Sequence, residues 1–417
     1  MNKVRTDVML IAEKALESVL PETAVRKALQ RLNISGRVVV VAVGKAAWKM
    51  AHAAREQIKK GFEKGIVITK YGHCFGEIEG MELFEASHPI PDENSVIATQ
   101  RALDIVGNLT PDYTVLFLLS GGGSALFEKP AEGISLDDIA CITAQLLNCG
   151  ADITEINTIR KRLSCVKGGR FALASAPARV VSLVLSDVLG DRLDSIASGP
   201  ACADTTTSEE AVQIVEKYGL KVEPFVMKSL RVETPKSLTN VTSEIIGSVA
   251  TVCDNALKIA RSMGYESKVL TTTLDCEARE AGRFIASIAR EISSYERPLK
   301  RPCALIFGGE TVVRITGCGK GGRSQELAFA ASKGLQGLKN VALLSIGTDG
   351  TDGPTDAAGG LVDGTSYERM VELGIDLYST LMMNDSYNAL DKMGDLVKTG
   401  PTGTNVNDLG ILLMGER

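Results

Sequence analysis

The stretch Tyr113-Thr-Val-Leu-Phe-Leu-Leu-Ser-Gly-Gly-Gly-Ser124 joins a run of apolar, strand-forming residues to a loop of three glycines between two serines. The apolar half predicts a buried β-strand. The glycines let the loop backbone adopt left-handed angles and approach a ligand closely, so that successive N–H groups can point at one anion. The stretch therefore predicts a phosphate site at Ser120, Gly121, Gly122, Gly123 and Ser124, although a tight turn would also explain the glycines.

Similar apolar runs recur along the chain and alternate with segments of helical period. This alternation is typical of parallel sheets that are covered by helices. The expected strands lie at 37–43, 65–69, 83–86, 113–119, 179–185, 267–271, 304–307, 340–346 and 409–414, with another near Glu244 and a β-arm at 312–315. Helices are expected at 136–148, 152–165, 209–218, 255–263, 276–292 and 323–333.

A polar stretch from about Asp204 to Asn240, which contains Pro224 and Pro235, separates two blocks of alternating elements. We place the domain boundary at its end, which gives one α/β domain at 1–240 and a second at 241–417. Two such domains in one chain imply a cleft between them, and clefts of this kind favour small-molecule chemistry.

Composition excludes several classes of protein. With 417 residues, 44% of them hydrophobic and 23% charged, the chain reads as a globular protein. A net charge of −5 argues against a general nucleic-acid binder, since that role needs a basic face. We find no apolar run near the roughly 20 residues that cross a bilayer, and no signal-like N-terminus, so we expect a cytoplasmic protein without a membrane partner. Nine cysteines without a CxxC pair, and only three histidines, argue against zinc and a disulfide framework.

Two cations stand in unusual settings. Lys45 follows the strand at 37–43 at a helix start, where its ammonium would lie beside an anion attracted to the helix N-terminus. Arg323 ends the glycine-rich run that begins at Gly317, and its guanidinium suits two-point contact with phosphate or carboxylate. A solvated lysine and a disordered hairpin tip remain the alternatives.

Acidic loops follow two further strands. Asp187 and Asp191 leave the strand at 179–185, and Asp349 and Asp352 leave the strand at 340–346. Carboxylates are preferred Mg²⁺ ligands and can accept a hydroxyl proton during phosphoryl transfer. Helix capping or turn chemistry would account for the same residues. His88, in a loop fixed by two prolines, is a further candidate, with a capped surface turn as the alternative.

Ten strings, in order from about residue 40 to the C-terminus, resemble the class II glycerate kinases. They are Val43-Gly-Lys-Ala46, His88-Pro-Ile-Pro-Asp92, Ser120-Gly-Gly-Gly-Ser124, Lys167-Gly-Gly169, Ser186-Asp-Val-Leu-Gly-Asp191, Ile196-Ala-Ser-Gly-Pro200, Gly308-Gly-Glu-Thr311, Gly321-Gly-Arg323, Gly347-Thr-Asp-Gly350 and Gly400-Pro-Thr-Gly-Thr-Asn405. One departure is that the family commonly has asparagine after the arginine, where this chain has Ser324.

The resemblance implies an N-terminal Rossmann-like domain with a mostly parallel sheet, a smaller C-terminal α/β domain and an active-site cleft between them. It implies that ATP phosphorylates D-glycerate at the 2-hydroxyl, and that Lys45 and Arg323 face each other across the cleft and are needed for activity. ATP and Mg²⁺ are thus the expected cofactors.

On this basis each candidate receives an expected role. The Ser120–Ser124 loop holds phosphates, while Asp187, Asp191 and Glu310 contact the substrate or accept its proton. Asp349 and Asp352 bind Mg²⁺, and closure of the two domains keeps water from the transferable phosphate.

Two other functions remain as alternatives. One is a nicotinamide-dependent hydroxypyruvate reductase, which would act on a related substrate. Against it, no G-x-G-x-x-G motif follows an expected strand, and the loop after Val43 has a lysine where a dinucleotide-binding fold requires glycine. A two-lobed ligand sensor would not need so many aspartates. A Walker A motif is absent, so nucleotide binding rests on the family resemblance.

Overall fold

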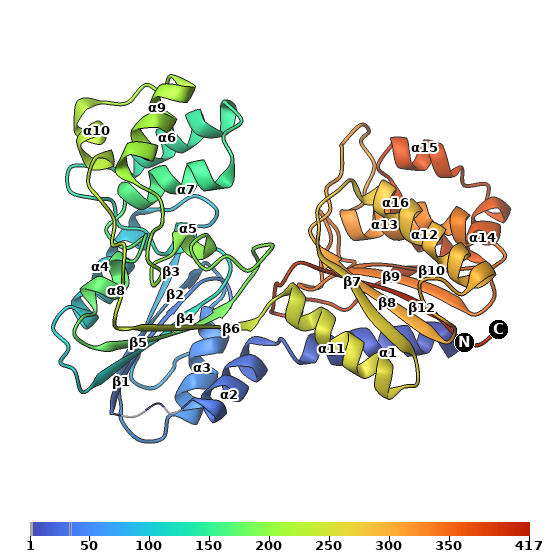
Figure 1. Cartoon of the computed structure of the whole chain (residues 1–417), viewed down its shortest axis with the longest axis horizontal. Coiled ribbons are helices and arrows are strands. Elements are labelled where there is room, and N and C mark those ends of the chain that lie inside the picture. Colours follow the sequence, from blue (N-terminus) through green and yellow to red (C-terminus); the bar gives the residue numbers. More distant parts are fainter. Residues whose placement is uncertain (1–2, 33, 35) are drawn as a thin grey trace. The chain divides into compact units, whose positions relative to one another are not determined.

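The protein, described here by a computed structural model for residues 3–32, 34 and 36–417, consists of two compact α/β units. The inserted unit comprises Pro21–Ile246. The terminal unit combines Met1–Leu20 with Gly247–Arg417. Each unit has its own six-stranded sheet (Figure 1), which confirms the expected fold class of two α/β domains.

The sheet of the inserted unit has the strand order β3-β2-β1-β4-β5-β6. Its strands are β1 (Arg37–Val43), β2 (Phe62–Lys70), β3 (Met81–Ala86), β4 (Tyr113–Leu119), β5 (Arg179–Leu185) and β6 (Val241–Gly247). Strands β1 to β5 pair in parallel. The loops after β1, β4 and β5 therefore leave three neighbouring strands at one edge of the sheet, where open α/β sheets bind ligands.

Strand β1 shows why this sheet is covered on both faces. Its odd-numbered valines, 39 to 43, belong to a core with α4 (Glu93–Val106) and α8 (Arg170–Ala174). Its even-numbered residues pack with α2 (Pro21–Arg31) and α3 (Ala47–Gln57). Because successive side chains of a strand point to opposite faces, an unbroken apolar run such as Val38–Val43 suits a strand that is buried on both sides.

Four helices of the inserted unit form a separate helical lobe with a core of its own. They are α6 (Leu136–Asn148), α7 (Ile153–Arg162), α9 (Ser208–Tyr218) and α10 (Pro224–Leu230), at the upper left of Figure 1. Helices α6, α7 and α9 confirm the expected helices at 136–148, 152–165 and 209–218. The other short helices of this unit are α5 (Gly123–Leu126) and the 3₁₀ helix η1 (Ile196–Ser198).

The sheet of the terminal unit has the order β11-β10-β9-β12-β8-β7. Its strands are β7 (Glu266–Leu274), β8 (Cys303–Gly309), β9 (Val341–Gly347), β10 (Gly359–Asp363), β11 (Leu396–Val397) and β12 (Asp408–Met414). Strand β12 runs antiparallel to both β8 and β9, so that Asp408 at its start pairs with Gly309 and with Gly347. The start of β12 thus lies beside the carboxyl ends of β8 and β9.

Helices cover both faces of the terminal sheet (Figure 1). Helices α12 (Ala278–Tyr295) and α13 (Arg323–Leu335) share one core with α14 (Ser366–Glu372), α15 (Leu377–Met382) and α16 (Ser386–Met393). Helix α1 (Lys3–Glu17) contacts β9 and β12, and α11 (Val249–Ser262) contacts α1, β7 and β8.

The division of the chain differs from the boundary expected at 240/241. Helix α1 belongs to the terminal unit, where Arg5 lies 2.8 Å from the Asp363 carboxylate and 3.0 Å from that of Asp395. The expected strand near Glu244 is β6, and it joins the sheet of the inserted unit. The alternation of strands and helices predicts the elements themselves, whereas the sheet that each one joins depends on contacts between distant segments.

The β-arm expected at 312–315 is not a strand in this structure. Val312 makes only an isolated bridge to Glu277, and the segment is otherwise a loop. Val312 and Ile315 are 55% and 81% exposed, so their apolar pattern reflects neither a sheet face nor a core. The remaining expected strands and helices are confirmed, with ends that differ by a few residues.

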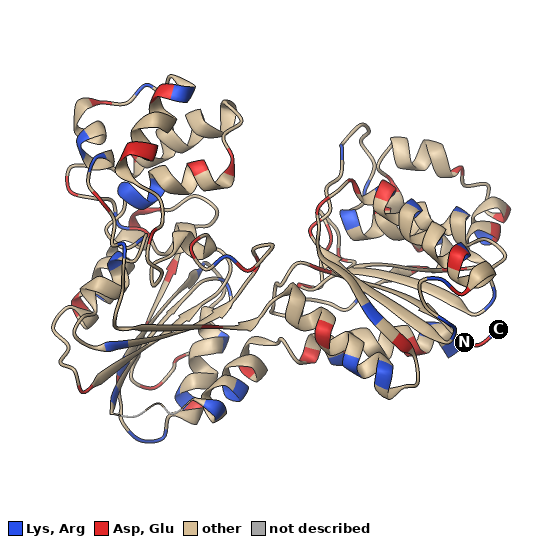
Figure 2. Cartoon of the chain, viewed as in Figure 1, with Lys and Arg blue, Asp and Glu red and all other residues tan. Residues whose placement is uncertain are grey.

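Basic and acidic residues are interspersed along the ribbons of both units (Figure 2). Among the described residues, no helix combines the length and the apolar character needed to span a membrane.

Candidate active site

The glycine loop of the inserted unit, Ser120–Ser124, is tied by hydrogen bonds to the connection between β1 and α3. The backbone N–H of Lys45 donates to the carbonyl oxygen of Gly121 at 2.9 Å. The Ser120 hydroxyl accepts from the N–H of Ala46 at 3.1 Å and donates to the carbonyl of Val43 at 3.3 Å. Two loops that lie far apart in the sequence therefore form one surface at the carboxyl ends of β1 and β4.

Three candidate side chains lie against this glycine loop. A Cβ atom placed on Gly121 would be 2.1 Å from Oδ2 of Asp187. One on Gly122, whose φ is +87°, would be 3.0 Å from Cδ2 of His88 and 3.3 Å from Cγ of Lys45. Glycine is required here because side chains approach the backbone too closely for a larger residue. Burial, together with the charge of Lys45, lowers the pKa of His88.

The glycine loop is also held by two cations of the inserted unit. Nζ of Lys167 donates to the carbonyl oxygens of Ser124 at 2.9 Å and Phe127 at 3.0 Å, and it lies 2.7 Å from the Glu128 carboxylate. Arg160 donates to the same Ser124 carbonyl at 3.3 Å. Burial lowers the pKa of Lys167 to about 8, against the opposing charge of Glu128. These contacts fix the far end of the loop.

The segment 187–199, which follows β5, carries the acidic candidates in an unusual backbone conformation. Asp191, Ala197 and Ser198 have φ values of 54°, 50° and 58°, in the left-handed region that residues with a Cβ rarely adopt. Oδ1 of Asp191 is buried without a hydrogen-bond partner among the described residues. Cβ of Ala197 lies 2.7 Å from where a Cβ on Gly123 would be, so this segment packs directly on the glycine loop.

The terminal unit contains a cavity of about 690 Å³ at the carboxyl ends of β8 and β9. The candidate residues Glu310, Arg323, Asp349 and Asp352 all line it, together with Asp408 and Asn407. The side-chain amide nitrogen of Asn407 is buried without a partner among the described residues. The walls of the cavity are therefore rich in carboxylates, which surround the guanidinium of Arg323.

Arg323 is held in the cavity by two carboxylates. Its Nε and Nη2 donate to the two oxygens of Asp408 at 2.6 and 3.0 Å, and its Nη1 donates to Glu310 at 2.8 Å. Two parallel N–H bonds to one carboxylate fix the plane of the guanidinium as well as its position. Burial raises the pKa of Asp408 to about 7, although the hydrogen bond from Arg323 acts in the opposite direction.

The two expected metal ligands have different surroundings. Both oxygens of Asp352 accept backbone N–H groups at the start of α13, from Ser324 at 3.2 Å and Gln325 at 2.8 Å. Burial raises its pKa to about 6. Asp349 is half-buried and accepts one N–H bond, from Thr351, through Oδ1. No group of three or more His, Cys, Asp or Glu side chains within the described ranges is placed to hold a metal ion.

The glycine-rich run before α13 packs closely against residues 383–387. A Cβ on Gly317 or Gly319 would lie 2.4 to 2.6 Å from backbone atoms of Met383. The ammonium of Lys320 lies 3.8 Å from the ring centre of Tyr387. Gly317-Cys-Gly-Lys-Gly-Gly322 has the spacing G-x-G-x-x-G. It does not directly follow a strand, since β8 ends at Gly309, and its glycines serve contacts within the protein.

The candidates thus gather in two places, one in each unit. The inserted unit holds Lys45 and Asp187 beside the glycine loop, with Asp191 on the adjoining segment. The cavity of the terminal unit is lined by Glu310, Arg323, Asp349 and Asp352. That Lys45 and Arg323 face each other stays a prediction. Sequence reasoning missed Asp408, for which the only signal was its place at the end of the polar loop 400–408.

Comparison with known proteins places the chain in a family. Residues 7–231 match a model described as a domain of unknown function, DUF4147, and residues 303–408 match the MOFRL family. A D-glycerate 2-kinase from Thermotoga maritima is 57% identical over 97% of each chain. A crystal structure of glycerate kinase from the same organism superposes with a TM-score of 0.97 at 56% identity, covering 99% of this chain and 100% of that one.

One relative has a different name. A protein from Agrobacterium vitis, provisionally named as a hydroxypyruvate reductase, is 42% identical over 91% of this chain and 100% of its own length. The resemblance to glycerate kinases is higher in identity, spans nearly the whole of both chains and extends to a solved structure. The chain belongs to the glycerate kinase family.

Proposed function

We propose that this protein is a glycerate 2-kinase, which transfers the terminal phosphoryl group of ATP to the 2-hydroxyl of D-glycerate. The observation that carries the proposal is the 57% identity, over 97% of both chains, to a relative named D-glycerate 2-kinase. The geometry of the two sites supports it, because phosphoryl transfer depends on positioning and on neutralising charge rather than on covalent chemistry by the protein.

In the inserted unit, Lys45 is the cation for the transferred group. Its stem lies against Gly122, and within the described part of the chain its ammonium has no ion-pair or hydrogen-bond partner. An ammonium without an internal partner beside a glycine loop is suited to neutralise a phosphate. The loop Ser120–Ser124 offers the backbone that would hold the phosphate oxygens.

Asp187 is the proton acceptor that the geometry favours. Its carboxylate lies against Gly121, next to the surface that Lys45 helps to form. A general base must reach the hydroxyl that attacks, while Lys45 stands beside the phosphoryl group that moves. Asp191 and Glu310 are the other candidates, and Glu310 is already engaged by Arg323.

In the terminal unit, Arg323 is the second cation of the reaction. Three of its N–H groups are bound by Asp408 and Glu310, which aim the guanidinium into the cavity. A guanidinium that is fixed before substrate arrives needs little reorganisation in order to stabilise the charge of the transition state.

The residues fit a magnesium nucleotide in part. ATP supplies the phosphoryl group, and Mg²⁺ on its phosphate oxygens offsets their charge. Mg²⁺ is commonly bound by only one or two carboxylates besides the phosphates, so a dense metal cluster is not required. Asp349 is the better candidate ligand, because both oxygens of Asp352 cap α13.

The test is a product assay that separates kinase from reductase. The purified protein is given ATP, Mg²⁺ and D-glycerate, ADP formation is measured, and the product is identified by phosphorus NMR as the 2- or the 3-phosphate. A parallel reaction with NADH and hydroxypyruvate is followed at the nicotinamide absorbance band. Glycerate-dependent ADP with 2-phosphoglycerate supports the proposal, whereas NADH oxidation without ADP formation would overturn it.

A further inference from the structure

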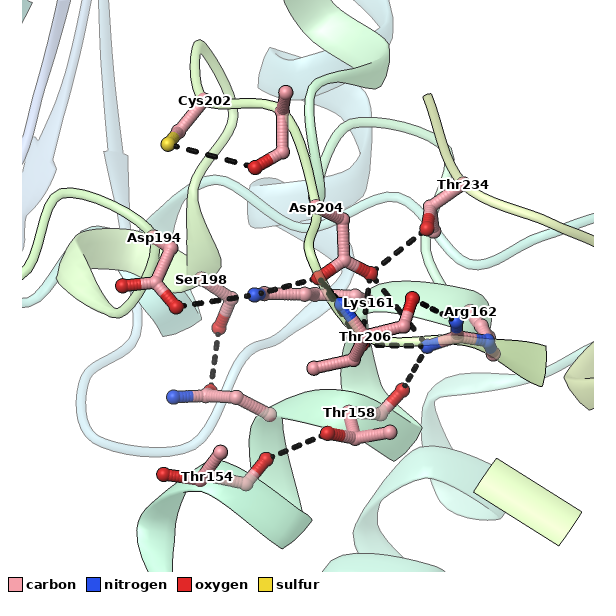
Figure 3. A network of polar contacts seen from close by, with 12 residues as sticks. Thr154, Thr158, Lys161, Arg162, Asp194, Ser198, Cys202, Asp204, Thr206 and Thr234 are labelled. Carbon is pink, nitrogen blue, oxygen red and sulfur yellow. Dashed lines mark hydrogen bonds and ion pairs between the residues drawn. The ribbon is translucent and has the colours of Figure 1, made fainter. Parts of the chain in front are cut away.

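A buried polar network joins the end of α7 to the segments 194–206 and 233–236 (Figure 3). Lys161 is 2% exposed, and its ammonium lies 3.0 Å from Oδ1 of Asp204 and 3.8 Å from Oδ2 of Asp194. The next residue, Arg162, lies 3.5 Å from Oδ2 of Asp204 and donates to the carbonyls of Thr158 and Thr206. Both cations therefore contact Asp204, but of the two only Lys161 contacts Asp194.

We propose that Lys161 is a positioning residue for the reaction, which holds the segment 187–199 against the glycine loop through Asp194. This inference rests on the proposed function. Lys161 touches neither the glycine loop nor the acidic candidates directly, so its role is to fix a segment that does.

The contacts form a continuous path from Lys161 to the glycine loop. The stem of Lys161 packs on Gly168, where a Cβ would lie 3.3 Å from Cβ of Lys161. The N–H of Gly168 donates to the carbonyl of Ser198 at 3.0 Å. Ser198 follows Ala197, whose Cβ packs on Gly123. Displacing the 195–199 turn would therefore move the surface that supports the glycine loop.

The backbone of this segment explains why it needs an anchor. Ala197 and Ser198 both have φ in the left-handed region, which is unfavourable for residues with a Cβ. Such conformations persist only where the surrounding contacts determine them. Two side-chain anchors come from α7. One is the ion pair from Lys161 to Asp194 (Figure 3), and the other is the hydrogen bond from the Ser198 hydroxyl to Asn157 at 2.9 Å.

The same segment begins with Asp187, whose carboxylate lies against Gly121. A shift of about 1 Å in a reacting group can cost on the order of a hundredfold in rate. Loosening the anchor should therefore lower kcat even though the anchor itself touches no substrate.

Three substitutions separate positioning from stability. Lys161→Met keeps the length of the side chain and removes the charge. Asp194→Asn breaks the same ion pair from the other side, and it also loses the pair of Asp194 with Arg192 at 2.9 Å, whose side chain is 52% exposed. Arg162→Gln is the matched control, since it weakens the buried Asp204 cluster without a direct contact to the segment 187–199.

The experiment measures kcat, KM for D-glycerate, melting temperature and amide hydrogen exchange of the ligand-free proteins. We expect kcat to fall about tenfold or more in Lys161→Met and Asp194→Asn, with a smaller change in KM. The amides of Gly168 and Gly169 should exchange faster in both variants. The double variant should lose less kcat than the product of the two single losses, because the Lys161–Asp194 contact is removed in both single variants. Arg162→Gln should melt earlier without a comparable loss of kcat.

Two results would overturn the inference. One is a wild-type kcat in Asp194→Asn, and the other is a loss of kcat in Arg162→Gln that matches that of Lys161→Met at equal melting temperature. Failure of the proposed function is distinguishable, because a wild-type protein without glycerate-dependent ADP formation would reject that function alone. The exchange comparison would then still test whether Lys161 holds the segment.

Discussion

Arg323 and Asp408 form a two-point ion pair between the first residue of α13 and the first residue of β12, with N–O distances of 2.6 and 3.0 Å. Glu310 holds a third N–H of the same guanidinium at 2.8 Å. The pair joins the helix to the central strand of the terminal sheet. Asp408 therefore determines the orientation of the Arg323 guanidinium. It belongs to the candidate site although it is part of a strand rather than of a loop.

Substituting Asp408 should cost more activity than substituting Glu310. Asp408→Asn leaves one acceptor oxygen in place of two, while Glu310→Gln removes a single contact at a side chain that is 47% exposed. A hydrogen bond to a charged group contributes about 1.5 to 3 kcal/mol, so kcat/KM for D-glycerate should fall roughly ten- to a hundredfold in Asp408→Asn. A smaller loss than in Glu310→Gln would contradict this order.

Lys45 should be required for turnover but not for folding. Lys45→Ala removes an ammonium that has no ion pair within the part of the chain that the structure describes. Loss of one group that stabilises transition-state charge costs about 10²- to 10³-fold in kcat, so a loss of that size is expected with an unchanged melting temperature. Lys49→Ala, on helix α3 just after this connection, is the matched control and should keep its activity.

A methyl group on Gly121 should displace Asp187. Gly121→Ala places a Cβ 2.1 Å from Oδ2 of Asp187, closer than any real contact, so the carboxylate must move. We expect a lower melting temperature and a loss of kcat. In an Asp187→Ala background the same substitution should cost much less stability, because the clashing atoms are gone. Equal costs in both backgrounds would show that the clash is not with Asp187.

The stability of the terminal unit should depend on pH through Asp352. Burial raises its pKa to about 6, above the ordinary value of 3.8, so the folded protein prefers the protonated form. The stabilising contribution of the proton is complete below about pH 4 and is lost as pH rises through about 6. Asp352→Asn removes this dependence, so its melting temperature should improve relative to the wild type between pH 4 and 7. Calorimetry at several pH values checks the trend, and a constant difference would contradict it.

The dependence of activity on Mg²⁺ concentration should distinguish Asp349 from Asp352. Asp349→Asn should raise the Mg²⁺ concentration needed for half-maximal activity, because the carboxylate that we propose as a metal ligand is lost. Asp352→Asn should leave that concentration nearly unchanged, since Asp352 caps α13. A titration of ADP formation against Mg²⁺ tests both, and the reverse pattern would assign the metal to Asp352.

The sequence alone predicts most helices and strands, and it predicts that the candidate site residues lie in loops at the ends of strands. The run 115–119 is apolar throughout because β4 is buried on both faces, and the glycines after it mark a backbone that other side chains approach. The same reasoning could not assign β6 or α1 to a unit. An amphipathic helix indicates that one face is buried, but not against which segment.

Two details of the site depend on contacts between distant segments. Asp408 pairs with a residue 85 positions away, which no local pattern reveals. Asp352, for which the sequence predicts metal binding, caps α13, and its role as a metal ligand stays a prediction. One signal for the cap was present, because Gly322 precedes the helix and glycine has no side chain with which to satisfy the first N–H groups. A helix that begins this way requires an acceptor from elsewhere.

The docking of α1 on the terminal unit has a consequence for how the chain is made. Residues 3–17 are synthesised before the whole inserted unit, yet their partners α11, β9 and β12 come from residues 249–414. Val8 and Ile11 are fully buried in the folded protein, so their side chains stay exposed during synthesis until these partners have been made. Chains that stall before β9 and β12 would therefore expose part of the apolar face of α1 to chaperones, while the inserted unit can already have folded.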